Sequence, residues 1–329
     1  MKNPESTAAN EVNTKEVNTK EVNTDAANAD AVIIGGGPAG LNAALMLGRA
    51  RKRTIVIDAG QPRNAVTREA HGFLTRDGIA PFELRRIAIE QLGAYPSVSH
   101  IEDTVVSITG EDGAFLLETA SGLKLTSKKL LFAAGMKDRR LDIPGLAKVY
   151  GKSAFVCPYC DGWELRDQPL VIISRGAALM HLAPLLYGWT KQFAVCTNGP
   201  DELTEAEREE LRAHAIPLFD TPIREIASEE GMVKHVKLMD GTEIPCTGIF
   251  FRPELAPGTD LPHSLGCRIS EQGILEVGES GQTSMPGIYA AGDAATMMHQ
   301  SIAAAASGAL AAAAVNGELN REAWKAGLV

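Results

Sequence analysis

Two cysteines, Cys157 and Cys160, stand two residues apart in the stretch FVCPYCDGWE, and Asp161 follows them directly. Such a pair can bind a metal, form a structural disulfide or exchange electrons with a substrate. A zinc site needs four ligands, whereas the cysteines at positions 196, 246 and 267 are scattered singly and no second CxxC exists. We therefore expect no metal, favour a redox-active pair, and interpret the three single cysteines as core residues.

Length and composition limit the classes of protein to consider. The chain has 329 residues, 45% of them hydrophobic and 22% charged, with a formal net charge of −9. These values are typical of a globular protein of two domains, and an acidic chain without a run of Lys or Arg is a poor nucleic-acid binder. The alanine-rich run from Ile302 to Val315 is too short to span a bilayer, so we expect a buried helix there.

Residues 1–29 differ in composition from the rest. They contain EVNTK twice and then EVNTD, a polar repeat that has little to bury, so we expect a disordered tail. They also lack the apolar segment of a signal peptide. With only five cysteines in the chain, this leads us to expect a cytoplasmic protein, in which a close cysteine pair is catalytic rather than structural.

A glycine-rich loop follows the tail. It lies between an apolar strand, Ala31–Ile34, and a helix expected to end near Ala50; a second strand, Thr54–Ile57, then ends on an acid. This order of strand, turn, helix, strand and acid is the dinucleotide-binding pattern in its full context. The three glycines permit a tight turn, a close approach of the pyrophosphate, and close packing of helix on strand. The residues predicted to bind the cofactor here are Gly35, Gly37, Pro38, Ala39, Gly40 and Asp58.

The C-terminal segment SMPGIYAAGDAATMMHQSIAAAASG carries a second pattern. A predicted strand, Gly287–Ala291, leads into Gly292, Asp293 and the alanine-rich helix. This segment resembles the second FAD-contacting motif of the two-dinucleotide flavoprotein reductases. The resemblance implies FAD as the cofactor, with Asp293 on its ribityl chain and the helix start at Gln300 and Ser301 facing the flavin ring. A simple helix N-cap is the alternative role for Asp293.

The order of the motifs resembles one family, the low-molecular-weight thioredoxin reductases, from about Asp30 to the C-terminus. The stretch LLFAAGMKDRRLDIPG is similar to their A-T-G strand, with Ala134 in place of Thr and Gly135 after it. The resemblance implies an α/β fold of two Rossmann-like domains, the second inserted into the first. It divides the chain into an FAD-binding domain of residues 30–146 and 270–329 and an inserted NADPH-type domain of residues 147–269, and it implies a homodimer.

The same resemblance implies roles for the CxxC segment. Cys160 would lie against the flavin and exchange electrons with it, and Cys157 would react with the substrate sulfur. Asp161 would move the thiol proton, because proton transfer needs an acid or base beside the sulfur; a helix cap is its alternative role. In the reductases the inserted domain rotates to admit NADPH, so a chain without NADPH is expected to keep a fixed arrangement with Cys160 at the flavin.

The second dinucleotide loop of that family is altered here. Ser174, Arg175 and Gly176 stand where three glycines are expected, and Leu179 occupies the position of the next small residue. The following strand, Phe193–Cys196, leads into Thr-Asn-Gly-Pro instead of the basic cluster that holds a 2′-phosphate. We therefore expect the inserted domain to keep the fold without binding NADPH.

Two directions of electron flow are open to a redox-active cysteine pair beside FAD. In the first, a substrate dithiol reduces the cysteine pair, the pair reduces FAD, and O2 reoxidises FAD; enzymes that close the disulfides of gliotoxin- and holomycin-type natural products look like this. In the second, NADPH or a ferredoxin or flavodoxin drives a thioredoxin-reductase-like disulfide reductase. A flavin-bound redox sensor is a third possibility. The Pro-Tyr spacer and the Gly-Trp-Glu that follows look closer to the oxidase branch, which we favour.

One residue complicates the oxidase hypothesis. Those oxidases usually carry His directly after the second cysteine, where this chain has Asp161. A base could come instead from His299, beside the predicted flavin end of the last helix, or less favourably from His71. For each histidine, a packed or surface role is the alternative.

Two local elements are predicted within the inserted domain. Thr204–Ala213 has the pattern of a polar surface helix with Thr204 as its N-cap. Val233–Met239 and Glu243–Phe251, on either side of Asp-Gly, predict a hairpin.

Overall fold

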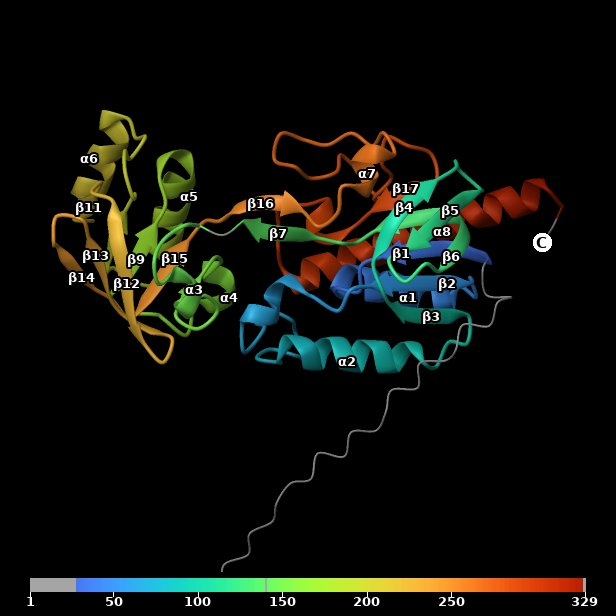
Figure 1. Ribbon diagram of the computed structural model, residues 1–329, viewed down its shortest axis with the longest axis horizontal. Helices are drawn as coiled ribbons and strands as arrows, with labels where there is room; N and C mark the ends of the chain where they lie inside the picture. Colours follow the sequence, from blue (N-terminus) through green and yellow to red (C-terminus); the bar gives the residue numbers. More distant parts are fainter. Residues whose placement is uncertain (1–27, 140, 328–329) are drawn as a thin grey trace, which may run out of the picture.

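The computed structural model describes residues 28–139 and 141–327, and the repeat-containing tail lies outside them. The chain forms two bodies joined by a pair of strands (Figure 1). Segments from both ends of the described chain build the first body, and the segment between them builds the second.

A seven-stranded sheet forms the centre of the first body. Four of its strands are parallel, in the order β3-β2-β1-β6, and β5 and β4 continue the sheet in antiparallel pairing. β17 pairs in parallel with the end of β6, so the C-terminal motif lies beside the N-terminal strands. The strands are β1 (Asn28–Ile34), β2 (Thr54–Asp58), β3 (Val98–Glu102), β4 (Val105–Thr109), β5 (Phe115–Thr119), β6 (Lys124–Phe132) and β17 (Ile288–Ala290).

Three helices share one hydrophobic core with this sheet: α1 (Pro38–Arg49), α2 (Pro81–Leu92) and α8 (Ser301–Lys325). α8 packs closely on α1, because a Cβ at Gly308 would lie only 2.0 Å from the backbone oxygen of Ala39. Among the described helices, α8 is long and apolar enough to cross a membrane. Its alanines at positions 304, 305, 311 and 312 are nevertheless buried against the first body, whereas Ile302 and Leu310 are exposed, so the predicted helix is buried on one face only.

A buried lysine ties α8 to the sheet. The side chain of Lys129 on β6 is fully buried, and its Nζ lies 2.7 Å from Asp112 and 2.6 Å from Glu318, with Glu322 also in contact. Burial opposes the positive charge, but these three carboxylates outweigh it and raise the pKa of Lys129. The lysine occupies the centre of the acidic cluster, so this group is an ion-pair network rather than a metal site.

The second body contains a five-stranded parallel sheet in the order β11-β10-β9-β15-β8. Its helices α5 (Gly176–Leu186) and α6 (Glu205–Ala213) follow β9 and β10. Thr204 caps α6 with a reciprocal capping box, which confirms the predicted helix and its N-cap. The strands are β8 (Ala154–Phe155), β9 (Leu170–Ile173), β10 (Phe193–Cys196), β11 (Leu218–Phe219) and β15 (Gly248–Phe251).

The predicted hairpin is only partly correct. β13 (Met232–Leu238) does pair in antiparallel fashion with β14 (Glu243–Pro245), and β12 (Ile223–Glu229) completes this three-stranded sheet. The second half of the predicted strand, however, is β15 in the parallel sheet. All four residues of β15 are buried, as in a strand covered on both faces, so the segment divides at Cys246 and Thr247.

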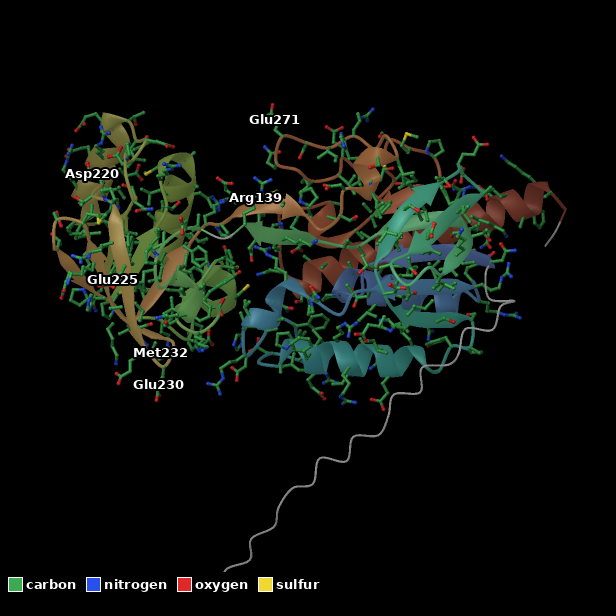
Figure 2. All side chains as sticks on the ribbon, viewed as in Figure 1. Arg139, Asp220, Glu225, Glu230, Met232 and Glu271 are labelled. Atoms are coloured by element: carbon green, nitrogen blue, oxygen red, sulfur yellow. The ribbon has the colours of Figure 1, made fainter. Side chains whose placement is uncertain are left out.

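Two antiparallel strands join the bodies: β7 (Met136–Arg139) enters the second body and β16 (Glu254–Pro257) returns from it. Arg139, labelled in Figure 2, lies in this connection, and its Nη1 is 3.9 Å from Oε2 of Glu254. The short helices α3 (Leu146–Val149) and α4 (Pro158–Asp161) lie on the side of the second body that faces the first (Figure 1). The predicted fold, two Rossmann-like domains with the second inserted into the first, is confirmed.

Candidate active site

One cavity of about 1860 Å³ connects the first glycine loop to the cysteine pair. Residues of both bodies form its walls, so sequence segments that are far apart meet around one space. Most of the residues predicted for the site line it: Gly35, Gly37, Pro38, Ala39, Asp58, Ala134, Gly135, Cys157, Cys160, Asp161, Asp293, His299, Gln300 and Ser301.

The predicted residues Gly40 and Gly292 lie behind the cavity wall. A Cβ at Gly40 would be 1.9 Å from the backbone oxygen of Gly35, and one at Gly292 would be 2.9 Å from the Cβ of Ala39. Both glycines therefore allow the close packing that positions the loop, while other residues form the surface that a ligand would touch.

The glycine loop has the geometry of a phosphate cradle. Gly35 has φ +112°, and a Cβ there would be 2.3 Å from the backbone oxygen of Ala133, so only glycine fits. Gly37, the N-cap of α1, has open space where its Cβ would stand. A pyrophosphate can thus approach the backbone at the positive end of the α1 dipole.

Asp58 has a partner that the sequence analysis did not find. The guanidinium of Arg85, on α2, forms an ion pair with the Asp58 carboxylate, and Gly60 donates its backbone N–H to the same carboxylate at 3.2 Å. The Nε atom of Arg85 is buried without a hydrogen-bond partner among the described residues. Asp58 lines the cavity, whereas Arg85 lies behind it, so the ion pair orients the carboxylate that a ligand would touch. No motif in the sequence points to this pair, because Arg85 lies on an otherwise ordinary amphipathic helix.

These features fit FAD. The cradle would receive its pyrophosphate, Asp58, held by Arg85, would bind the adenosine ribose, and Asp293 and the start of α8 line the same cavity. The cavity then continues to the two sulfurs, as a flavin that exchanges electrons with thiols requires.

The cysteines are held by β8 and by the short helix α4, of which Cys157 is the N-cap. Both are free thiols. A hydrogen bond from Cys160 is the main cause that lowers the pKa of Cys157 to about 7, and the charge of Arg63 contributes. The same hydrogen bond and burial raise the pKa of Cys160. One sulfur of the pair is therefore a ready nucleophile at neutral pH, and the other keeps its proton.

Asp161 lies directly behind the pair, and its pKa is raised to about 7. Burial is the main cause, and the nearby charges of Cys157 and Glu164 add to it, whereas His71 acts in the opposite direction. A carboxyl group that titrates near neutral pH beside a thiol that does the same is well matched for exchanging a proton with it. This geometry supports the acid/base role over the helix-cap alternative, since Asp161 ends the four-residue helix α4 rather than beginning a helix.

Arg63 is a second residue that the sequence analysis missed. It lies on the short 3-10 helix η2 (Arg63–Val66) and donates from Nε and Nη2 to Asp138 at 2.9 and 2.7 Å. Its Nη1 lies 2.9 Å from Nδ1 of His299 and 3.5 Å from Asp293. Asp138 also accepts a hydrogen bond from Tyr150 of the second body. Arg63 therefore joins three separate chain segments at the edge of the cysteine site.

The contact with Arg63 defines what His299 can do. An arginine can only donate, so Nδ1 of His299 accepts and the neutral ring carries its proton on Nε2. Burial lowers the pKa of His299, which keeps the ring neutral. His299 is thus a donor in this arrangement, which favours Asp161 over His299 as the base. His71 lies near Asp161 from the other side and lines the same cavity.

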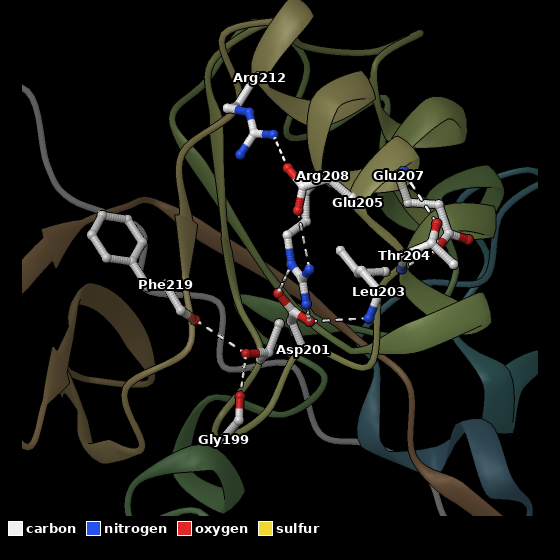
Figure 3. A network of polar contacts seen from close by, with 10 residues as sticks. Gly199, Asp201, Leu203, Thr204, Glu205, Glu207, Arg208, Arg212 and Phe219 are labelled. Atoms are coloured by element: carbon white, nitrogen blue, oxygen red, sulfur yellow. Dashed lines mark hydrogen bonds and ion pairs between the residues drawn. The ribbon is translucent and has the colours of Figure 1, made fainter.

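The altered second glycine loop is closed by the loop that follows β10. The backbone N–H of Gly176 donates to the backbone oxygen of Asp201 at 2.8 Å, and Arg175 forms an ion pair with Glu202 at 3.3 Å. Figure 3 shows how Asp201 is fixed: Arg208 donates two hydrogen bonds of 2.8 Å to its carboxylate. The amide and the arginine that could meet a phosphate are already engaged, and two carboxylates stand beside them.

Further contacts hold this closing loop in place. The hydroxyl of Thr197 donates to the backbone oxygen of Gly199 at 2.6 Å and lies 3.3 Å from that of Phe219. Leu179, where the family pattern has a small residue, is fully buried in the core of the second body. The large cavity at the cysteine pair is not lined by Ser174, Arg175 or Gly176, and neither is a smaller cavity beside it.

Comparisons with known proteins agree with this architecture. The model of the pyridine nucleotide-disulphide oxidoreductase family matches residues 29–312. The thioredoxin reductase sirT of Leptosphaeria maculans is 30% identical over 87% of this chain and 93% of its own, and the thioredoxin reductase aclD of Aspergillus oryzae is 31% identical over 88% and 95%.

Solved structures are similar over the same extent. The putative thioredoxin reductase TrxB of Bacillus anthracis is 40% identical with a TM-score of 0.85, covering 89% of this chain and 99% of that one. HlmI is 32% identical with a TM-score of 0.86, covering 92% and 95%. The predicted resemblance to the thioredoxin reductases is confirmed, and the chain belongs to the pyridine nucleotide-disulphide oxidoreductase family, whose members are flavoprotein oxidoreductases.

Proposed function

We propose that this protein is an FAD-dependent thiol–disulfide oxidoreductase that oxidises a substrate dithiol to a disulfide, with O2 as the electron acceptor and without NADPH. One observation carries the proposal: the cysteine pair shares a cavity with an open cofactor cradle, while the second dinucleotide loop is closed by Asp201 and Glu202. In the overall reaction the substrate loses two electrons and two protons, and O2 gains them as hydrogen peroxide.

FAD would be held by the Gly35–Gly40 loop, by Asp58 with Arg85, and by Asp293 with the start of α8. When bound, it supplies a two-electron acceptor between the thiols and O2.

The chain's own residues would carry out the thiol chemistry. A substrate thiolate attacks the sulfur of Cys157 in the oxidised pair, and Cys160 leaves. The second substrate thiol then attacks the mixed disulfide and releases Cys157. A thiol with a pKa of about 7 is a good leaving group for that step, and Asp161 accepts the thiol protons.

A disulfide reductase is the second candidate, supplied with electrons by NADPH or by a ferredoxin or flavodoxin. The names of three relatives favour this reductase, because sirT, aclD and TrxB are all called thioredoxin reductases. Asp161, directly after the second cysteine, also favours it, because the family resemblance implies that the reductases carry an acid at this position.

The visible flavin absorbance of the purified protein distinguishes the two candidates. Under anaerobic conditions one sample receives NADPH and another receives dithiothreitol, and air is then admitted. We expect bleaching by dithiothreitol alone, followed by recovery of the absorbance and formation of peroxide in air. Prompt bleaching by NADPH would refute the proposal and establish the reductase.

We further propose a homodimer, as the family resemblance implies. Apolar side chains are exposed along the length of α8, among them Ile302, Leu310 and Trp324. Light scattering on the purified protein should give twice the mass of the chain, and a monomer would contradict this assignment.

A further inference from the structure

A second cavity, of about 680 Å³, lies beside the cysteine site. Its walls come from both bodies: Glu69 and His71 from the first, and Asp161, Glu164 and Met232 from the second. Met232, which lines this cavity, is labelled in Figure 2. Asp161 and His71 line both this cavity and the larger one, so this pair forms part of the boundary between them.

His71 lines both cavities together with Asp161 and contacts a group of outer carboxylates. Its side chain is only 17% exposed, and its Nε2 lies 3.6 Å from Glu69 and 3.7 Å from Glu164. Its Nδ1 lies 3.6 Å from Asp77. The three outer carboxylates are between 43% and 69% exposed, so they are in contact with solvent.

The other charged groups of this cavity do not replace His71. Arg68, Lys152 and Lys234 also line it, but a guanidinium does not release a proton at neutral pH and an ordinary ammonium does so poorly. Histidine is the side chain that ordinarily gains and loses a proton in this range.

Thiol–disulfide exchange makes a demand on this arrangement. Exchange passes the protons of the substrate thiols to the released cysteines, and the cysteine pair loses two protons when it is oxidised to the disulfide again. Asp161 must pass on a proton that it has accepted before it can act again. The second cavity, which Asp161 and His71 also line, offers this proton a route away from the cysteines.

We propose that His71 is a proton relay between Asp161 and solvent, with Glu69, Glu164 and Asp77 as the outer acceptors. Asp161 gives its proton, directly or through water in the second cavity, to the neutral imidazole of His71. The ring then releases a proton to a carboxylate or to solvent and returns to its neutral form. This inference rests on the proposed function only in requiring thiol–disulfide exchange, and it holds for either direction of electron flow.

The test is the rate at which dithiothreitol bleaches the flavin of the oxidised holoenzyme, measured anaerobically by stopped flow. His71→Ala should slow bleaching about tenfold, less than the roughly 100-fold or more that a direct acid–base group contributes, because His71 acts through Asp161. Added imidazole should restore the rate, in proportion to its neutral fraction as the pH is varied. His71→Gln, which keeps the size and polarity of the side chain, should be equally slow and equally rescued.

His214→Ala is the matched control, because His214 lines neither cavity. It should bleach at the wild-type rate with no response to imidazole. Wild-type rates in both His71 variants, or slow rates that imidazole does not raise, would overturn the relay while the proposed function stands. Failure of the wild type itself to bleach would overturn the proposed function and the relay with it.

Discussion

The hydrogen bond from Cys160 is the largest cause of the low pKa of Cys157, so removing it tests the cysteine chemistry directly. Cys160→Ala leaves Cys157 with its burial, which raises the pKa, and with the weaker effects of backbone amides and of Arg63. We therefore expect the pKa of Cys157 to move from about 7 back towards the ordinary value of 9.0. At pH 7, the thiolate would fall from about one half of the population to about one hundredth, roughly a 50-fold loss.

Alkylation by iodoacetamide measures this change, since only the thiolate reacts. The rate of labelling of the Cys157 peptide is followed by mass spectrometry across a pH series, and it rises as the pH passes upward through the pKa of the thiol. Cys196, Cys246 and Cys267 are at most 3% exposed, so they should contribute little. The midpoint should lie near 7 in the wild type and well above 8 in Cys160→Ala.

Two further variants make the result specific. Cys160→Ser keeps a hydroxyl donor and should give a midpoint between the other two, whereas Cys196→Ala, remote from the pair, should leave the midpoint unchanged. If Cys160→Ala keeps the midpoint near 7, the thiolate of Cys157 is stabilised by something other than Cys160, and the assignment of Cys157 as leaving group loses this support.

Three other changes have expected outcomes. Lys129→Met leaves three carboxylates facing one another and should lower the free energy of unfolding by about 3 kcal/mol in a urea titration, because it breaks a buried ion-pair network; an unchanged midpoint would contradict the network. Gly151 has φ +74° and a Cβ there would lie 2.1 Å from the backbone oxygen of Val66, whereas Gly113 has φ +87° and open space. Gly113→Ala should therefore lower the free energy of unfolding by about 1 kcal/mol, and Gly151→Ala should lower it clearly more. Equal losses would mean that the two bodies are not held together at Gly151. Arg85→Gln should weaken FAD binding about tenfold, or 1.4 kcal/mol, as measured by flavin fluorescence during titration of the apoprotein; unchanged affinity would remove Arg85 from the cofactor site.

Local patterns in the sequence were sufficient to predict the cofactor cradle. The glycine loop, α1 and the acid at the end of β2 depend on backbone conformations and spacings within about thirty residues, and the structure places them as expected. The hairpin failed at β15 because the partners of that strand, β8 and β9, come from a distant part of the chain. Nothing local distinguishes a strand that turns back from one that crosses to another sheet.

The residues that the sequence analysis missed share a physical reason. Arg63 acts on the cysteines only because η2 lies against β7 and the start of α8, and Arg85 meets Asp58 only because α2 packs against α1 and so reaches the end of β2. Neither arginine belongs to a motif, so its role becomes visible only when separate segments are brought together. The altered second loop was visible as missing glycines, but its closure by Asp201 and Glu202 was not.

The closed loop and the contacts between the two bodies both support a dithiol oxidase that works without NADPH. The proposed function without NADPH removes the need for the inserted domain to rotate and admit it. Here Tyr150 of the second body donates to Asp138, Asp138 holds Arg63, and Gly151 meets the backbone of Val66 without room for a Cβ. These contacts hold Cys157 and Cys160 at the cofactor cavity. A dithiol oxidase needs its cysteine pair within reach of the flavin and of the substrate at the same time, and a fixed interface between the bodies is the arrangement that provides both.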